Sequence, residues 1–342
     1  MRVCTSLAFQ QGYRQHANSS GPSLCRVCGY SGLHNGLCSG TITLMLVGAF
    51  EIPEPVPELH DTCAVVMLRP WVDVGRVGTL VLTQLEKHTG AKELGRLARP
   101  GVFYDFTRYR PRTRTVDGER ILSIPNTVVH WAKDEGTKRD YLFVHLREPH
   151  AMGEDFSEAV VTLLEHFDVT DYCRIGGFYD SVPHTRPILV TGTLTEAQAE
   201  RAKGLVSPRR NTYQGPTSVV NLVNEGLEAS NIQTTSLMAH LPQYVQLDRD
   251  HYGAYRLLEA LCAMYGFPTS IASPDRGEQQ YLEISRAVGN SLEISGVIQQ
   301  LESEYDRVQS SEEPETPLSI SPDVDKFLRE MSKRLEENPD VG

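Results

Sequence analysis

Apolar and polar positions along the middle of the chain predict strands interleaved with helices. Residues 63–68 form a continuous apolar run bounded by turn residues, which is typical of a strand buried on both faces. The residues after this run carry Val77, Leu80, Val81 and Leu85 on one helical face. By the same criteria, further strands are predicted at 127–131, 141–146 and 234–238, and helices at 156–167, 195–203, 219–227 and 252–265.

Strands that alternate with helices over about 200 residues predict an α/β fold with a mainly parallel sheet, covered by helices on both faces. A hairpin interrupts this order, because residues 113–116 and 120–124 flank Asp117-Gly118, a pair typical of a two-residue turn. Five arginines lie on or beside its arms: Arg108, Arg110, Arg112, Arg114 and Arg120. The cluster fits a docking surface for an acidic partner or a solvated hairpin face, and the sequence leaves both open.

Composition and periodicity divide the chain into a leader (1–44), an α/β core domain (45–276), a helical extension (277–308), a linker rich in Ser, Glu and Pro (309–321) and a terminal amphipathic helix (322–338). A terminal helix on a linker packs on its own core, on a sister subunit or on a foreign partner, and the pattern does not choose among them.

The leader differs from the rest of the chain in composition. The first 44 residues contain no Asp or Glu, whereas the rest of the chain holds all 44 acidic residues. Two explanations are open: an organellar transit peptide, which is acid-poor, or sequence upstream of a later start at Met45, where an apolar run begins. We favour the later start, so we expect the leader to be non-native or disordered. It also holds Cys25, Cys28, His34 and Cys38, the ligand types of a zinc knuckle, and a zinc-binding module is therefore a further hypothesis.

The net charge of −11 is divided as +3 on the leader, −7 on residues 45–301 and −7 on residues 302–342. An acidic body without a basic stripe argues against nucleic acid and anionic membranes as partners. No apolar stretch is long enough to span a bilayer. Cys63, Cys173 and Cys262 lie in apolar contexts, as buried thiols in a reducing cytoplasm do, so a cytoplasmic protein is expected.

Polar residues follow several of the predicted strands and are the candidates for ligand binding. They are Trp71, Asp73 and Gly75 after the first strand, Gly176, Gly177, His184, Thr185 and Arg186 in a loop from 176 to 187, Tyr213 and Gly215 in a second Gly-Pro loop, and His240 and Tyr244 after a third strand. If these strands are parallel, their loops converge on one edge of the sheet, where α/β proteins bind ligands.

Each of these residues also has a structural interpretation. Asp73 precedes a helix and fits its N-cap as well as a catalytic role. His184 and Arg186 fit an ion-pair network that holds the loop as well as a site for an anion. We assign no catalytic residue, no metal ligand and no cofactor within the core.

The same motifs, in this order, resemble the bacterial branch of the proteasome-assembly-chaperone-2-like family. They are Trp71-x-Asp73-x-Gly75, Gly176-Gly177, Pro183-His184-Thr185-Arg186-Pro187, Tyr213-x-Gly215-Pro216 and His240-x-Pro242-x-Tyr244. A helix with Leu301-Glu302 and Tyr305-Asp306 is similar to the C-terminal extension of that branch. The resemblance covers about residues 45–308. It implies a three-layer α/β/α core of phosphorylase/hydrolase-like type, homo-oligomers with trimers among them, no cofactor, and proteasome subunits as partners.

Members of this family are also labelled ATP-grasp enzymes, and the sequence argues against that activity. ATP-grasp sites need phosphate-binding lysines on strands, whereas the lysines of the core are expected at helix ends or in loops: Lys87, Lys92, Lys133, Lys138 and Lys203. The C-terminal residues, Pro339 to Gly342, lack a hydrophobic-tyrosine tail, which argues against docking on the proteasome through the terminus.

We therefore expect a self-associating, non-enzymatic interaction protein of assembly-chaperone type. Self-association is expected because the C-terminal helices carry apolar stripes that their own sheet or a neighbouring subunit must cover. The alternative is an enzyme that holds a small anionic substrate on Arg186 and transfers a proton through His184 or His240, with Asp73 nearby.

Overall fold

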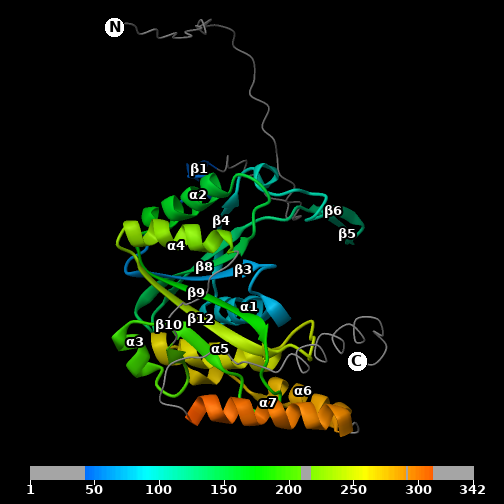
Figure 1. Ribbon diagram of the computed structural model, residues 1–342. Coiled ribbons are helices and arrows are strands. Elements are labelled where there is room, and N and C mark those ends of the chain that lie inside the picture. Colours follow the sequence, from blue (N-terminus) through cyan, green and yellow to red (C-terminus); the bar gives the residue numbers. More distant parts are fainter. Residues whose placement is uncertain (1–42, 209–216, 290–291, 311–342) are drawn as a thin grey trace, which may run out of the picture. The chain divides into compact units, whose positions relative to one another are not determined.

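The computed structural model describes residues 43–208, 217–289 and 292–310. Within these ranges, ten strands form one sheet and two more form a separate hairpin (Figure 1). In spatial order the sheet contains β1 (Leu44–Val47), β2 (Phe50–Pro53), β4 (Lys92–Leu97), β7 (Val128–Asp134), β8 (Arg139–Arg147), β3 (Thr62–Arg69), β9 (Val169–Asp180), β12 (Gln233–Pro242), β10 (Val190–Thr193) and β11 (Ser207–Pro208). Outside the described residues lie the cysteines of the leader, Tyr213, Gly215, residues 311–321 of the predicted linker and the segment 322–338 predicted as a terminal helix.

The centre of the sheet is parallel, as its apolar sequences predict. The side chains of β3 from Cys63 to Leu68 are fully buried, and β3 pairs in parallel with β8 and β9, while β9 pairs in parallel with β12. On one side of this centre a short turn joins β7 to β8, and such a turn permits only antiparallel pairing. On the other side β12 pairs antiparallel with β10. The predicted α/β class is confirmed, with parallel strands at the centre of a mixed sheet.

Helices cover both faces of the sheet (Figure 1). They are α2 (Gly153–His166) and α4 (Val219–Ala229) on one face, and α1 (Val77–Thr89), α3 (Glu196–Arg201) and α5 (His251–Tyr265) on the other, with short 3-10 turns η1 (Val74–Arg76), η2 (Pro100–Val102) and η3 (Thr269–Ile271). Alternation along β3 divides its side chains between two cores: Val65 and Met67 pack on the α1 side, and Val66 and Leu68 on the α2 side. The three layers predicted for the core are therefore present.

Two further helices, α6 (Asp275–Val288) and α7 (Leu292–Ser310), pack against the α5 side of the body. Tyr281 of α6 is buried, and its hydroxyl donates to Asp250 Oδ2 over 2.8 Å. Leu301 of α7 is buried among Tyr244 and Val245, together with other apolar residues of α6 and α7. Among the described residues, the same chain thus covers most apolar side chains of these two helices, and Leu282 of α6 stays exposed.

The predicted hairpin is confirmed as β5 (Arg112–Val116) and β6 (Glu119–Ser123), paired antiparallel around Asp117-Gly118. It forms a sheet of its own and projects from the body (Figure 1). Every residue of both strands is exposed.

The boundary predicted at Gly176 was wrong, because β9 continues to Asp180 and β12 continues to Pro242. Gly176, Gly177 and His240 therefore lie in strands rather than in loops. The glycines make room for a neighbouring segment: a Cβ on Gly176 would lie 2.3 Å from Val72 O, and Gly177 N donates to that oxygen over 2.8 Å. Glycine inside a strand marks such close approaches of backbone, and the sequence was misread as a loop.

The prediction that all core lysines lie at helix ends or in loops was wrong for two of them. Lys92 begins β4, which was not predicted as a strand because half of its residues are charged. Lys133 lies in β7, which extends three residues past Trp131. Both side chains are exposed. Among the described helices, none combines the length and apolar character needed to cross a membrane.

Candidate functional site

The segments that follow β3, β9 and β12 lie together, because these strands are adjacent and parallel. Asp73 forms a parallel bridge with Gly177. Asp250 N donates to Gly75 O over 2.8 Å, and a Cβ on Gly75 would lie 2.7 Å from the side chain of Asp250. Trp71 is exposed beside this crossing. Backbone contacts therefore bring Asp73, Gly75 and Gly177 together, with Asp250 beside Gly75.

Asp73 is buried at the start of α1 and is bound by that helix. Its Oδ2 accepts a hydrogen bond from Thr79 Oγ1 over 2.6 Å, and its Oδ1 accepts one from Thr79 N over 3.1 Å. Burial raises the pKa of Asp73, and the hydrogen bonds from Thr79 oppose that rise. Asp73 is not the N-cap of α1, because that position is Arg76. Its side chain instead accepts both hydrogen bonds of Thr79 in the first turn of the helix.

His184 and His240 are also bound within the chain. Tyr244 Oη lies 2.7 Å from both the backbone N and the ring Nδ1 of His184. His240 Nδ1 lies 2.6 Å from Asp180 Oδ2, and its Nε2 lies 2.8 Å from Thr191 Oγ1. Burial lowers the pKa of His184. Both imidazoles are held in place by side chains that follow or belong to the central strands.

Arg186 is bound to α7 rather than presented to a ligand. Its Nε and Nη2 donate to the two carboxylate oxygens of Asp306 over 2.9 and 2.8 Å, and its Nη1 donates to Glu302 Oε1 over 3.1 Å. The neighbouring Thr185 donates to the same Glu302 oxygen, and Tyr305 Oη donates to Pro187 O over 2.9 Å. The hydrogen bond to Asp306 raises the pKa of Arg186. These contacts support the interpretation that the loop is an attachment point for the C-terminal helix.

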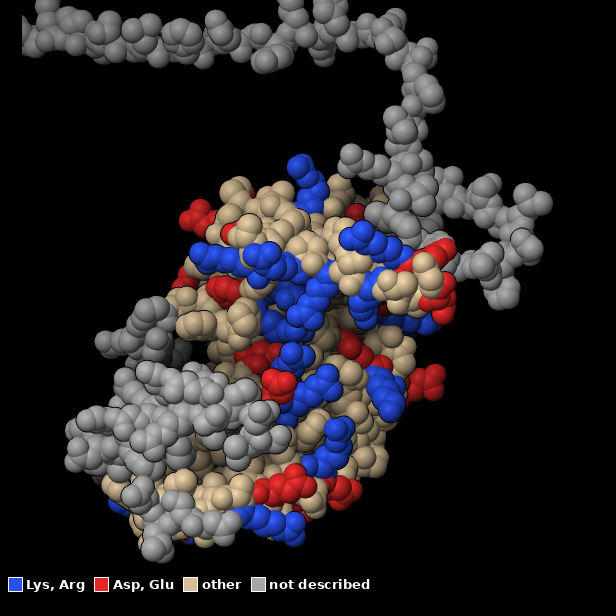
Figure 2. Space-filling view, turned by 90° about the vertical axis from the view of Figure 1, so that its right-hand side faces the viewer, with Lys and Arg blue, Asp and Glu red and all other residues tan. Residues whose placement is uncertain are grey.

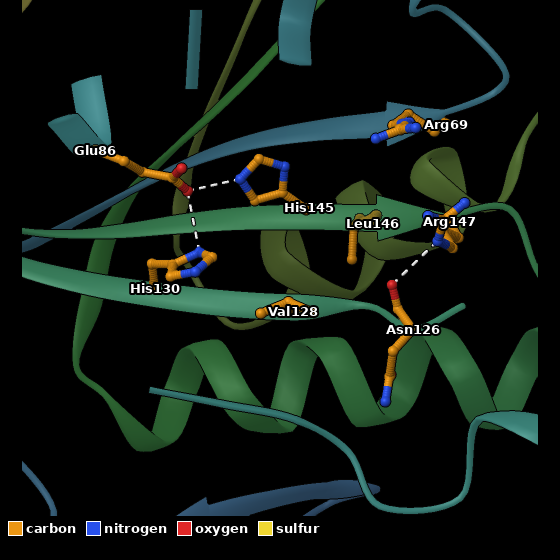
Figure 3. A pocket seen from close by; sticks show the side chains of 8 residues that line it. All are labelled: Arg69, Glu86, Asn126, Val128, His130, His145, Leu146 and Arg147. Atoms are coloured by element: carbon orange, nitrogen blue, oxygen red, sulfur yellow. Dashed lines mark hydrogen bonds and ion pairs between the residues drawn. The ribbon is translucent and has the colours of Figure 1, made fainter. Parts of the chain in front are cut away.

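A second polar cluster, which sequence reasoning missed, lies on the other side of β3 (Figure 3). It consists of Glu86 in the last turns of α1, His130 in β7 and His145 in β8. Glu86 Oε1 lies 2.6 Å from His145 Nε2 and 3.0 Å from His130 Nδ1. Burial alone would raise the pKa of Glu86, whereas its interactions with His130 and His145 bring it down to about 2. The carboxylate is therefore ionised between the two rings.

These three residues line a pocket of about 370 Å³. The other lining residues are Arg69, Asn126, Val128, Leu146 and Arg147. Arg69 and Arg147 end the parallel strands β3 and β8 and stand opposite each other in the register. Burial lowers the pKa of Arg147, and the positive charges of Arg69 and Arg112 lower it further. The pocket thus contains the Glu86, His130 and His145 cluster on one part of its wall and two neighbouring arginines, Arg69 and Arg147, at the strand ends.

No sequence motif predicts this pocket. His130 and His145 lie in two segments that were predicted as strands, and this was the only available signal. The register shows why they meet: His145 pairs with Val128, and His130 pairs with Phe143, so both imidazoles share the face toward α1. That register is a property of the folded hairpin and is not readable from either segment alone.

Comparison with known proteins identifies a family over most of the core. The PAC2 family model matches residues 67–277. No curated protein matches the chain.

Solved structures share the fold at low identity. A protein of unknown function from Corynebacterium glutamicum has a TM-score of 0.68 and 22% identity, covering 78% of this chain and 99% of that one. A PAC2 family protein from Streptomyces avermitilis has a TM-score of 0.61 and 22% identity, covering 69% and 99%. A proteasome-assembly chaperone homologue from Mycobacterium tuberculosis has the same TM-score, identity and coverage as the Streptomyces protein. At these identities the likeness establishes the fold.

Proposed function

Because the chain belongs to the PAC2 family, we propose that it is a self-associating, non-enzymatic interaction protein of the proteasome-assembly-chaperone type. Its proposed partners are a second copy of the chain and proteasome subunits, in the cytoplasm. The name of the Mycobacterium tuberculosis structure, a proteasome-assembly chaperone homologue, supports the choice of partner.

The β5–β6 hairpin is the observation that carries the proposal. Val116, Ile121 and Leu122 are 45%, 45% and 60% exposed, and Ile124, which follows β6, is 47% exposed. A two-stranded hairpin without cover is marginally stable in water. Exposed apolar residues gathered on one element indicate an interaction surface. A second protein surface would cover these side chains and stabilise the hairpin.

The charge of the hairpin indicates the kind of surface it would contact. Arg112, Arg114 and Ile121 lie on the same face of the hairpin in its register. Figure 2 shows the side of the molecule that lies on the right in Figure 1, where β5 and β6 are placed. Lys and Arg side chains gather over the upper part of this face. Arginine beside apolar side chains is typical of protein interfaces. The chain itself carries a net charge of −11, so another copy offers acidic surface to these arginines.

Light scattering after size exclusion tests the proposal. At micromolar concentration the intact chain should give a multiple of its 38.2 kDa mass. Replacing Val116 and Ile121 by Ser should lower that multiple, because both side chains are exposed and lie on the face that carries Arg112 and Arg114, and their loss leaves the core intact. Leu282→Ser is the matched control, since Leu282 on α6 is 46% exposed and lies away from the hairpin in sequence. A monodisperse monomer from the intact chain would contradict self-association, and an effect of Leu282→Ser equal to that of the hairpin variant would contradict the assigned surface.

The alternative of an enzyme at the strand-end loops loses its main support. That hypothesis needs Arg186 to hold an anionic substrate, and Glu302 and Asp306 occupy its guanidinium. A substrate would first have to displace α7.

A further inference from the structure

We propose that Glu86, His130 and His145 bind a Zn²⁺ ion whose remaining coordination positions face the pocket, where Arg69 and Arg147 hold an oxyanion. This site is independent of the proposed assembly function. It also departs from the expectation that the core has no metal ligands.

The donor atoms suit zinc in kind and in spacing. Two imidazoles and one carboxylate are a known ligand set for zinc sites that keep a position open. Zinc bound tetrahedrally at about 2.0–2.1 Å from each donor places the donors about 3.3 Å apart. The carboxylate oxygen of Glu86 lies 2.6 Å from His145 Nε2 and 3.0 Å from His130 Nδ1, and all ligand atoms lie within 4.8 Å of one another. To accommodate the ion, the distance from Glu86 to His145 would widen by about 0.7 Å and that from Glu86 to His130 by about 0.3 Å.

His130 gives independent support. Its Nδ1 is buried and lies 3.0 Å from Glu86 Oε1, yet it makes no hydrogen bond within the described residues. Buried polar atoms without a partner are uncommon because each one loses its hydration. Its contact with Glu86 has the distance of an ion pair without the geometry of a hydrogen bond. A metal ion between Glu86, His130 and His145 would bond this nitrogen directly.

The arginines indicate what occupies the open side of the ion. Arg69 and Arg147 are directly opposite in the parallel register of β3 and β8, and like charges in that position repel. Arg69 Nε forms an ion pair with Asp73 Oδ2 at 3.9 Å, a distance too long for a hydrogen bond, and Arg147 Nε donates to the backbone oxygen of Asn126 over 3.1 Å. An anion between the two guanidinium groups would relieve the repulsion. A phosphate or carboxylate oxygen bound to the zinc meets this requirement.

Zinc titration by calorimetry tests the metal half on the full chain after chelator treatment. The cysteines of the leader also have zinc-ligand types, so the parent protein for this experiment carries Cys25→Ser and Cys28→Ser. It should bind one Zn²⁺ per chain. His145→Gln should weaken the affinity at least about 100-fold, since even partners outside the ligand set change it by about 10–100-fold.

Two further variants make the titration decisive. Glu86→Gln keeps the shape of the side chain and removes its charge, so it should weaken zinc binding as His145→Gln does. With two ligand variants, the test stands even if one variant folds poorly. His88→Gln alters an exposed histidine on the same helix and should leave the affinity unchanged. The proposal is overturned if the parent binds zinc with a dissociation constant above about 1 mM, or if both ligand variants bind as tightly as the parent.

Inorganic phosphate tests the anion half. Co²⁺ replaces zinc as a spectroscopic probe, and phosphate should change the visible absorption of the cobalt-loaded parent. Arg69→Gln should weaken phosphate binding at least about tenfold, the effect of losing one charge-assisted hydrogen bond, and leave cobalt binding unchanged. Phosphate that leaves the spectrum unchanged, or binds the Arg69 variant equally well, would overturn the assignment of the arginines.

Discussion

Replacing Leu301 by Ala tests what holds α7 against the body. Leu301 is 2% exposed and packs with Ile298, Tyr244 and Val245 in a small apolar cluster. A buried Leu→Ala change destabilises by about 2–5 kcal/mol. We expect about 2–3 kcal/mol, because a small cluster near the surface can close partly around the missing atoms. Exposed ion pairs contribute less than this, so the apolar contact should outweigh the bonds of Arg186 to α7.

Native-state hydrogen exchange with mass spectrometry measures this effect directly. A loss of about 2–3 kcal/mol increases the population in which α7 is detached roughly 30- to 150-fold. Peptides from α7 should therefore exchange faster by that factor, whereas peptides from α5 should change little. Leu282→Ala provides the control for apolar truncation, because Leu282 is 46% exposed and contributes little buried surface.

The comparison with Arg186→Ala decides between apolar and polar attachment. If Leu301→Ala left the exchange of α7 unchanged, or if Arg186→Ala released the helix more than Leu301→Ala did, the polar contacts would be the dominant attachment. The strand-end loop would then have to be considered a clamp for α7 in its own right.

Two other predictions concern the same edge of the sheet. Burial lowers the pKa of His184 from 6.5, so the stability that its neutral ring contributes is present above that pH and is lost as the pH falls through the lower folded value. The free energy of unfolding, measured in urea, should therefore fall more for the parent than for His184→Asn when the pH is lowered from about 7.5 to about 5.5. Equal losses in the two proteins would contradict this sign. Gly176→Ala should lower the stability by about 1–3 kcal/mol, because its Cβ would lie 2.3 Å from Val72 O. Gly296→Ala in α7, where a Cβ meets no atom within 4 Å, should leave the melting temperature unchanged or slightly higher. A Gly176→Ala protein that melts with the parent would show that the Val72 segment can move.

The local elements were predictable because their causes are local. The apolar run at 63–68 requires a strand buried on both faces, and the helix predicted from residue 195 is present as α3 with Thr195 as its N-cap. Asp117-Gly118 likewise determined the hairpin. In each case the side chains that specify the element lie within a few residues of it.

The extent of β9 and the partners of Arg186 were not predictable, because their causes lie far away in the chain. Gly176 and Gly177 have weak strand propensity, and the strand continues through them because the segment at Val72 crosses there. Arg186 was placed correctly in a polar loop, but its partners Glu302 and Asp306 come from a helix more than a hundred residues later. Such pairings follow from tertiary packing, which a single sequence does not display.

The two polar regions beside β3 differ in a way that reverses the expectation from sequence. On the β9 side, the side chain of Arg186 and the Nδ1 of His184 are bound to partners within the described chain, whereas the buried Nε2 of His184 makes no hydrogen bond there. On the β8 side, the Nδ1 of His130 makes no hydrogen bond within the described residues, and Arg69 and Arg147 stand opposite each other in the register. Binding free energy is gained where partners are missing and is lost where partners must be displaced. The bonds of Arg186 to α7 therefore oppose anion binding at the family motif, and the pocket at Glu86, which no motif marks, is where we propose a ligand.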